Sequence, residues 1–415
     1  MPAPRSAPVP PRLPRPRPPP GPAVELESDI NVTFYRPAMT HTTFAPQAPS
    51  ALSADAPPSL LDPYASAALS TPNRVVMAPM TRFRAGEDSV PLPVVADYYA
   101  QRASAGLIVT EGIWPSFRGQ SGWRVPGLAT ARQITGWRRV TDAVHAAGGR
   151  VFAQLMHAGR IGHPLARIDG GHPAGPSAVP VPQAQHTPAG KQDPVVPLVM
   201  THDDIRTAIR DFADGARNAI RAGFDGVEIH GANSYLLHQF LADNTNLRQD
   251  AYGGDITGRI RFPAEVVRAV ADAVGAHRTA LRLSPGNPQF GMAEADPAPV
   301  YRALLDDLAH LGLAYLHLTE STPAYPALAD LRPHWPGTLI ANVGENGTAT
   351  TRAAGQAVLD SGHADLVSYG RAFLANPDLP HRFATGTPLA AHDPALLYTH
   401  GAEGYSDYLP SRAAR

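Results

Sequence analysis

Short apolar segments alternate with helical segments along most of the chain, and this alternation limits the possible folds more than any other feature. Eight segments have strand character, at residues 74–78, 106–110, 150–154, 225–229, 279–283, 314–318, 338–342 and 364–368. Strands that alternate with helices usually pair in parallel, with the helices packed outside. Eight such units predict a (β/α)8 TIM barrel of the α/β class. A doubly wound open sheet is the alternative, but no Gly-x-Gly-x-x-Gly motif follows the first strand.

The clearest helical segment begins after residue 200. Thr201 and Asp204 have the spacing of a capping box, in which two side chains close the first turn of a helix. Apolar residues then recur at helical spacing until Gly223, at Ile205, Ala208, Ile209, Phe212, Ala213, Ala216 and Ile220. This pattern predicts an amphipathic helix packed on the strands.

The longest connection, residues 157–200, leaves the third strand at the end where barrel enzymes carry their sites. It is rich in proline, glycine, histidine and glutamine and far exceeds an ordinary loop. We expect a long loop excursion with a small hairpin of its own. It is either a cover over the substrate or a tolerated surface insertion.

The N-terminal segment differs in composition from the rest of the chain. Its first 22 residues contain 11 prolines and four arginines, with little apolar bulk. Such a segment cannot form a core. We therefore predict a disordered Pro/Arg-rich extension at residues 1–57 and one barrel domain at residues 58–411. The extension is either a ligand for a proline-binding module or an extension without function, for which a start at Met39 is an alternative.

The composition excludes several classes of function. The chain has 415 residues, a formal net charge of -1 and no cysteine. Without cysteine it has no disulfide, thiolate metal site, iron–sulfur cluster or cysteine nucleophile. The near-neutral charge gives no sign of nucleic-acid binding, and no apolar run is long enough for a membrane span or secretory signal. We expect a cytoplasmic enzyme acting on a small molecule, as a monomer or homodimer.

The segment that follows the fourth strand carries the strongest chemical signal. His230 lies at the carboxyl end of that strand, and Asn233 follows where we expect the first turn of a helix. Tyr235 approaches from another direction, whereas Ser234 receives no role. Two neutral donors and a phenol suit a substrate whose carbonyl oxygen gains charge while a neighbouring carbon takes a proton. Each residue alone is more typical of a cap or core position, but the three together predict catalytic residues.

In a TIM barrel the carboxyl ends of all eight strands meet at one site, and phosphate is usually bound by the loops after strands seven and eight. Glycine amides and an arginine at those two loops suit a phosphate monoester. The first strand offers no pair of histidine and carboxylate ligands, so we predict no metal. The candidates at the strand ends are Pro79, Met80, Thr81, Gly112, Gln154, Met156, Arg282, Asn342, Gly344, Gly370 and Arg371.

Two other barrel chemistries fit less well. A Schiff-base aldolase needs a buried lysine at a strand end, and Lys191, the only lysine, lies in the long connection. A metal-dependent hydrolase needs clustered histidines and carboxylates. A binding module without turnover is a further alternative.

From about residue 60 to 408 the chain resembles the Old Yellow Enzyme family of FMN-dependent alkene reductases. The similar segments, in order, are residues 73–82 (NRVVMAPMTR), 98–108 (YYAQRASAGLI), 154–160 (QLMHAGR), the segment after His230, 249–254 (QDAYGG), 370–379 (GRAFLANPDL) and 401–408 (GAEGYSDY). The absence of cysteine separates the chain from the iron–sulfur dienoyl reductases.

The resemblance implies FMN as cofactor and NADPH or NADH as reductant. It implies cofactor contacts from Pro79, Met80, Thr81, Gly112, Gln154, Arg282, Asn342, Gly344, Gly370 and Arg371. His230 and Asn233 would hold the oxygen of an activated alkene (an α,β-unsaturated carbonyl or nitro compound), and Tyr235 would protonate its α-carbon. Tyr398, Met156 and Trp123 would form walls of the substrate pocket. Met156 stands where many members have a tryptophan. The loop from Asn342 to Gly347 is longer than usual in the family, so the resemblance does not identify which of its backbone amides bind the phosphate.

Overall fold

The computed structural model describes residues 57–320, 322, 324–344 and 349–411. Apart from Pro57, the predicted N-terminal extension lies outside the described residues.

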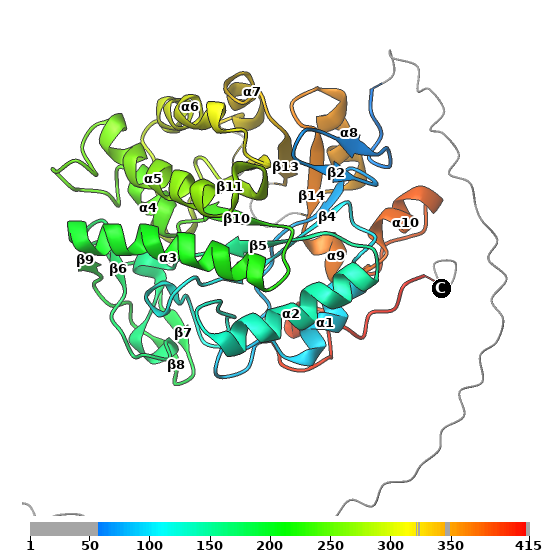
Figure 1. Cartoon of the computed structure of the whole chain (residues 1–415), viewed down its shortest axis with the longest axis horizontal. Coiled ribbons are helices and arrows are strands. Elements are labelled where there is room, and N and C mark those ends of the chain that lie inside the picture. Colours follow the sequence, from blue (N-terminus) through cyan, green and yellow to red (C-terminus); the bar gives the residue numbers. More distant parts are fainter. Residues whose placement is uncertain (1–56, 321, 323, 345–348, 412–415) are drawn as a thin grey trace, which may run out of the picture. The chain divides into compact units, whose positions relative to one another are not determined.

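Eight parallel strands form a closed barrel, and the helices surround it (Figure 1). The order around the barrel is β3, β4, β5, β10, β11, β12, β13 and β14, with β14 pairing back to β3. Their bounds are β3 (Val75–Met77), β4 (Leu107–Ile113), β5 (Val151–Leu155), β10 (Gly226–Gly231), β11 (Thr279–Leu283), β12 (Tyr315–Glu320), β13 (Leu339–Val343) and β14 (Leu366–Tyr369). The predicted TIM barrel is confirmed, and each predicted strand overlaps one observed strand.

A helix follows each barrel strand and covers it from outside. The α-helices are α1 (Pro93–Ala100), α2 (Ala131–Ala146), α3 (His202–Arg221), α4 (Leu236–Leu241), α5 (Ile256–Val274), α6 (Pro297–Leu308), α7 (Ala327–Leu331), α8 (Arg352–Asp360), α9 (Arg371–Ala375) and α10 (Leu379–Thr385). The capping box at α3 is present as predicted, because Thr201 and Asp204 each accept from the other's backbone N–H. No helix in the described part of the chain is long and apolar enough to cross a membrane.

Apolar side chains fill the barrel at the end away from the site. This inner cluster includes Val76, Val109, Phe152 and Ile340, all at most 3% exposed. Leu69, beside the short hairpin of β1 (Tyr64–Ala65) and β2 (Ser70–Thr71), belongs to the same cluster. The filled interior is a packed core, so the open end with the strand carboxyl termini is left for a ligand.

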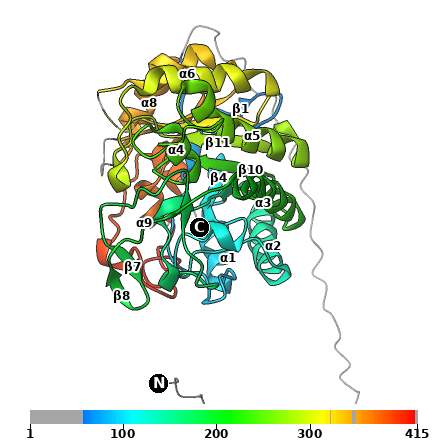
Figure 2. The same ribbon diagram turned by 90° about the vertical axis from the view of Figure 1, so that its left-hand side faces the viewer.

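The connection between β5 and α3 forms an excursion with four short strands. Within it β6 (Ala174–Gly175) pairs with β9 (Leu198–Val199), and β7 (Gln185–Thr187) with β8 (Gly190–Gln192) forms an antiparallel hairpin. In both Figure 1 and Figure 2 the hairpin projects from the body of the barrel.

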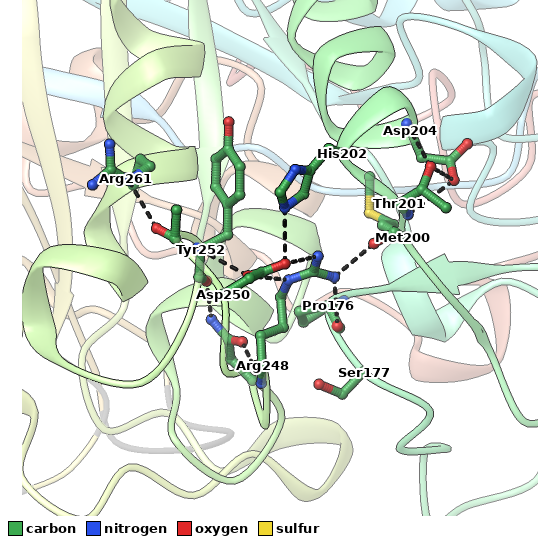
Figure 3. A network of polar contacts seen from close by, with 12 residues as sticks. Pro176, Ser177, Met200, Thr201, His202, Asp204, Arg248, Asp250, Tyr252 and Arg261 are labelled. Atoms are coloured by element: carbon green, nitrogen blue, oxygen red, sulfur yellow. Dashed lines mark hydrogen bonds and ion pairs between the residues drawn. The ribbon is translucent and has the colours of Figure 1, made fainter.

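Arg248 ties the two ends of the second half of this excursion together (Figure 3). Its guanidinium donates to the carbonyls of Pro176 and Met200 at 3.1 and 2.6 Å and to the carboxylate of Asp250. His202 at the start of α3 contacts the same carboxylate at 2.9 Å. The excursion is therefore fastened to the barrel at its base, while its hairpin extends outward.

Candidate active site

A cavity of about 440 Å³ opens at the carboxyl ends of the barrel strands. Every predicted site residue except Trp123 lines it. Those residues are Pro79, Met80, Thr81, Gly112, Gln154, Met156, His230, Asn233, Tyr235, Arg282, Asn342, Gly344, Gly370, Arg371 and Tyr398. The fold thus brings together side chains and loops from seven of the strand ends in one concave place, as a TIM barrel requires.

Trp123 does not line the cavity, so the structure does not bring it together with the other predicted residues. Its ring packs edge-on against His400 at 5.4 Å, and the Arg124 guanidinium lies over it. The wall at this side is formed by Tyr398, whose ring packs against Phe83 at 5.4 Å. Trp123 is held away because its contacts to His400 and Arg124 occupy its ring.

The turn after β10 is not the helical turn that the sequence suggested. Asn233 and Ser234 have φ angles of 52° and 70°, in the left-handed region, and α4 begins only at Leu236. Helical spacing therefore does not place Asn233 and Tyr235. The turn itself aims both at the cavity, where the Tyr235 ring packs 5.1 Å from the ring of His230. Left-handed backbone at two non-glycine residues is strained and is typical of functional sites.

His230 and Tyr235 are both uncharged at neutral pH. Burial, with the neighbouring Arg282, lowers the pKa of His230 to about 3. Burial, with a smaller effect of Tyr398, raises the pKa of Tyr235 to about 12. His230 is therefore a neutral hydrogen-bond donor, and Tyr235 keeps a proton that it can give to a substrate.

Neighbouring side chains fix the orientation of Asn233. Its backbone N–H donates to Ser284 Oγ at 2.8 Å, and its side-chain oxygen accepts from Asn287 Nδ2 at 3.3 Å. Because the oxygen is engaged there, the amide nitrogen of Asn233 is the atom left to donate toward the cavity. Ser284 and Asn287 were not predicted from the sequence, because they belong to no recognisable motif.

Arg282 is the principal cation of the inner cavity wall. Its Nη2 donates to Thr319 Oγ1 at 3.0 Å and to Asn342 Oδ1 at 3.2 Å, and its Nη1 lies 3.2 Å from His317 Nε2. His317 in turn contacts Glu228 at 2.8 Å, and both side chains are fully buried. We call Glu228 and His317 the inner pair. A buried arginine fixed on several sides presents its charge in one direction.

The glycines predicted to meet a phosphate also line the cavity. Gly344 has a φ of 152° and lines the cavity with Gly370 and Arg371, which begins α9. Residues 345–348 lie outside the described residues, so the question of which amides from Asn342 to Gly347 bind phosphate falls partly there.

Several features of the cavity lining are suited to binding FMN. The buried His230 Nδ1 and Arg282 Nε have no partner within the described protein. A Cβ at Gly112 would come within 2.5 Å of the end of the Met156 side chain, so glycine at this position lets Met156 pack directly against the strand end. The amide nitrogen of Gln154 is bound to Glu228 at 2.8 Å, which leaves its oxygen to accept from a ring N–H. A planar heterocycle with alternating donors and acceptors, joined to a phosphate, matches this set.

The loop after β11 also reaches the cavity and was not predicted. Gln289 and Phe290 line it, and Phe290 has a φ of 52°. The Ser234 hydroxyl donates to the carbonyl of Gln289, and Arg160 donates to that of Phe290 at 2.8 Å. Ser234, which received no role from sequence, thus supports one wall of the site. Beyond Met156, no described residue of the excursion lines the cavity, and Arg160 links the excursion to the site by supporting this loop.

Lys191 lies on β8 in the projecting hairpin, is exposed and does not line the cavity. A Schiff base at the strand ends is therefore excluded by position, since the chain has no other lysine.

Comparison with known proteins identifies the family. Residues 60–390 match the model of the NADH:flavin oxidoreductase / NADH oxidase family. Chanoclavine-I aldehyde reductase of Penicillium roqueforti is 42% identical over 352 residues, which cover 81% of this chain and 92% of that protein.

Similar solved structures support the same family assignment. An old yellow enzyme homologue from Zymomonas mobilis is 39% identical with a TM-score of 0.81, covering 85% of this chain and 99% of its own. Morphinone reductase in complex with tetrahydroNAD is 41% identical with a TM-score of 0.81, covering 86% and 99%. The chain therefore belongs to the NADH:flavin oxidoreductase / NADH oxidase family, the Old Yellow Enzyme family, and is an FMN-dependent oxidoreductase with a nicotinamide nucleotide as reductant.

Proposed function

We propose that this enzyme reduces the C=C bond of α,β-unsaturated carbonyl or nitro compounds. One observation carries the proposal: His230, Asn233 and Tyr235 face one cavity together with the residues suited to FMN. Two relatives, a chanoclavine-I aldehyde reductase and morphinone reductase, are named for carbonyl compounds. A small-molecule activated alkene is the expected substrate. Cytoplasmic location and a monomeric or homodimeric state stay predictions.

The cofactor would be held along the cavity by contacts with different functions. Pro79, Met80, Thr81, Gly112 and Gln154 would meet the ring system, and Arg282 with Asn342 would lie at its anionic edge. Gly344, Gly370 and Arg371 would bind the phosphate. When bound, FMN supplies hydride chemistry, taking a hydride from NAD(P)H and passing one to the alkene.

The substrate would be activated by two donors and one acid. His230 and Asn233 donate hydrogen bonds to its carbonyl or nitro oxygen, which gains negative charge as the β-carbon is reduced. The neutral state of His230 suits this, because it donates a hydrogen bond without giving up its proton. Tyr235 Oη delivers a proton to the α-carbon, which completes the saturated product. Met156 and Tyr398, which line the cavity, would form walls of the substrate pocket.

The test separates the two half-reactions by stopped-flow absorbance. His230→Ala should slow re-oxidation of the reduced enzyme by 2-cyclohexenone by roughly 10²-fold, the cost of losing one such donor. Its reduction by NADPH should change much less. A re-oxidation rate equal to that of the wild type would remove His230 from the proposed role.

Tyr235→Phe tests the acid separately. The alkene step should fall by roughly 10²-fold or more, because a general acid is lost, while reduction by NADPH is retained. Tyr252→Phe is the matched control, since Tyr252 Oη donates to Glu265 away from the cavity. Equal losses in both variants would mean that the Tyr235 hydroxyl has no special role.

A further inference from the structure

The inner pair lies inside the barrel directly beneath the cavity. Glu228 comes from β10, two residues before His230, and His317 comes from β12. Both side chains are 0% exposed, with His317 Nδ1 2.8 Å from Glu228 Oε2 and His317 Nε2 2.8 Å from Ser368 Oγ. A carboxylate buried to this degree needs a compensating charge or donors.

The charge that compensates Glu228 is that of Arg282. Burial and the Arg282 cation lower the pKa of His317 to about 4, so His317 is neutral at neutral pH. Burial opposes the ionisation of Glu228, but His317, Arg282 and Gln154 outweigh it and lower its pKa to about 2. Burial lowers the pKa of Arg282 and the Glu228 carboxylate opposes that effect; Arg282 stays a cation, because a guanidinium is not deprotonated in proteins. The buried unit is therefore one anion and one cation with a neutral imidazole between them.

Two cavity-lining side chains, Gln154 and Arg282, contact the inner pair. Gln154 donates to Glu228 Oε1 at 2.8 Å, and Arg282 lies 3.2 Å from His317 Nε2. The structure thus couples the buried carboxylate to the cavity through two residues expected at the pyrimidine edge of FMN. Glu228 itself does not line the cavity.

We propose that Glu228 is a positioning residue that sets the reduction potential of FMN by partly neutralising the field of Arg282. This inference rests on the proposed function for the placement of Arg282. A reduced flavin gathers negative charge at its pyrimidine edge, and a nearby cation stabilises it. A buried anion behind that cation weakens the stabilisation, because charges in the interior are poorly screened. Glu228 therefore keeps the potential lower than Arg282 alone would set it, so that reduced FMN remains a good hydride donor to the alkene.

The chain contains a matched control at a second buried glutamate–histidine pair. Glu294 lies 3.3 Å from His238, with side chains 4% and 0% exposed. Its oxygens accept from Tyr301 Oη at 2.9 Å and the Gly286 N–H at 2.6 Å. We call Glu294 and His238 the outer pair. Neither residue lines the cavity or contacts Arg282.

The experiment measures the FMN reduction potential of the holoenzyme by dye equilibration for the wild type, Glu228→Gln and Glu294→Gln. We expect Glu228→Gln to raise the ratio of reduced to oxidised FMN about tenfold at a fixed solution potential. For a two-electron couple this is about 30 mV. Glu294→Gln should stay at the wild-type value, and Glu228→Asp, which keeps the charge, should return toward it. Glu228→Met is made in parallel, because it removes the charge without burying a new amide.

An unchanged potential in Glu228→Gln or Glu228→Met with FMN bound would overturn the inference. So would an equal rise in Glu294→Gln. Failure of both Glu228 variants to fold or hold FMN, beside an intact Glu294→Gln, would assign Glu228 a structural role instead. A wild-type protein that binds no FMN would refute the proposed function and not this inference alone, so the two failures are distinguishable.

Discussion

Two buried glutamate–histidine pairs stand at different depths of this molecule. The inner pair, Glu228 and His317, lies inside the barrel on β10 and β12. The outer pair joins His238 on α4 to Glu294 in the connection before α6. Residue types and burial are nearly the same, but their other partners differ.

The inner pair contacts a charged side chain, whereas the outer pair accepts hydrogen bonds from backbone N–H groups. Beside the inner pair stands Arg282, which lines the cavity. In the outer pair His238 Nδ1 accepts from the Ser234 N–H at 3.1 Å, and Glu294 accepts from the Gly286 N–H. Those amides belong to the two loops that carry Asn233 and Phe290. The third partner of a buried glutamate–histidine pair, more than the pair itself, therefore determines whether the pair acts on electrostatics or on loop geometry.

The largest expected effect comes from removing the histidine of each pair. His317→Leu removes one partner of the buried Glu228 carboxylate and should lower the free energy of unfolding by about 3–5 kcal/mol. His238→Leu should cost less, roughly 1–3 kcal/mol, because both oxygens of Glu294 keep donors. Urea denaturation of the holoenzymes at pH 7 measures both. A larger loss for His238→Leu would reverse the comparison.

The pH dependence of stability is the next largest effect. The folded-state pKa of His317, about 4, lies below the ordinary value of 6.5. Below pH 6.5 the His317 imidazole is protonated in the unfolded chain but stays neutral in the folded protein. Stability therefore falls as pH drops from 6.5 toward 4. His317→Gln removes this contribution and should make the slope shallower by up to about 1.4 kcal/mol per pH unit. Identical slopes between pH 5 and 6.5 for variant and wild type would contradict the assigned neutral state.

A smaller effect, on catalysis, is expected at the loops that the outer pair contacts. Ser234→Ala removes the hydroxyl that donates to the Gln289 carbonyl and so loosens the loop carrying Phe290. We expect kcat/KM for 2-cyclohexenone to fall roughly tenfold, the loss of about one hydrogen bond, with the FMN potential unchanged. A shifted FMN reduction potential in Ser234→Ala would show that these loops also affect the cofactor electrostatically.

The smallest effect on stability is expected for an exposed ion pair, which serves as a reference for the two buried pairs. Arg217 and Asp214 form an exposed ion pair on α3, with side chains 51% and 66% exposed. Arg217→Ala should change the free energy of unfolding by less than about 0.5 kcal/mol, because solvent screens such pairs. A loss as large as that of His238→Leu would mean that burial is not what separates these pairs.

The barrel was predictable from sequence because its signal is repeated eight times. Each apolar strand and its helix give independent evidence, and errors of a few residues at the strand ends do not alter the topology. Most site residues were predictable for a related reason, since a barrel gathers whatever follows its strands at one end.

Local geometry and partner choice were not predictable. The left-handed backbone of Asn233 and Ser234 depends on bonds to Ser284 and His238, which come from other segments. Trp123 turned away because His400, far along the chain, packs against it. Glu228 carried a usable signal, a charged residue two positions before His230 on an apolar strand and so on the same face. Its connection to Arg282 through His317 required the closed barrel.

The most direct test is an anaerobic visible spectrum of the purified enzyme, reduced with NADPH and then mixed with 2-cyclohexenone. We expect a bound flavin band that bleaches with NADPH and returns with the enone. A protein that stays colourless after FMN is supplied, or a bleached band that the enone does not restore, would contradict this expectation.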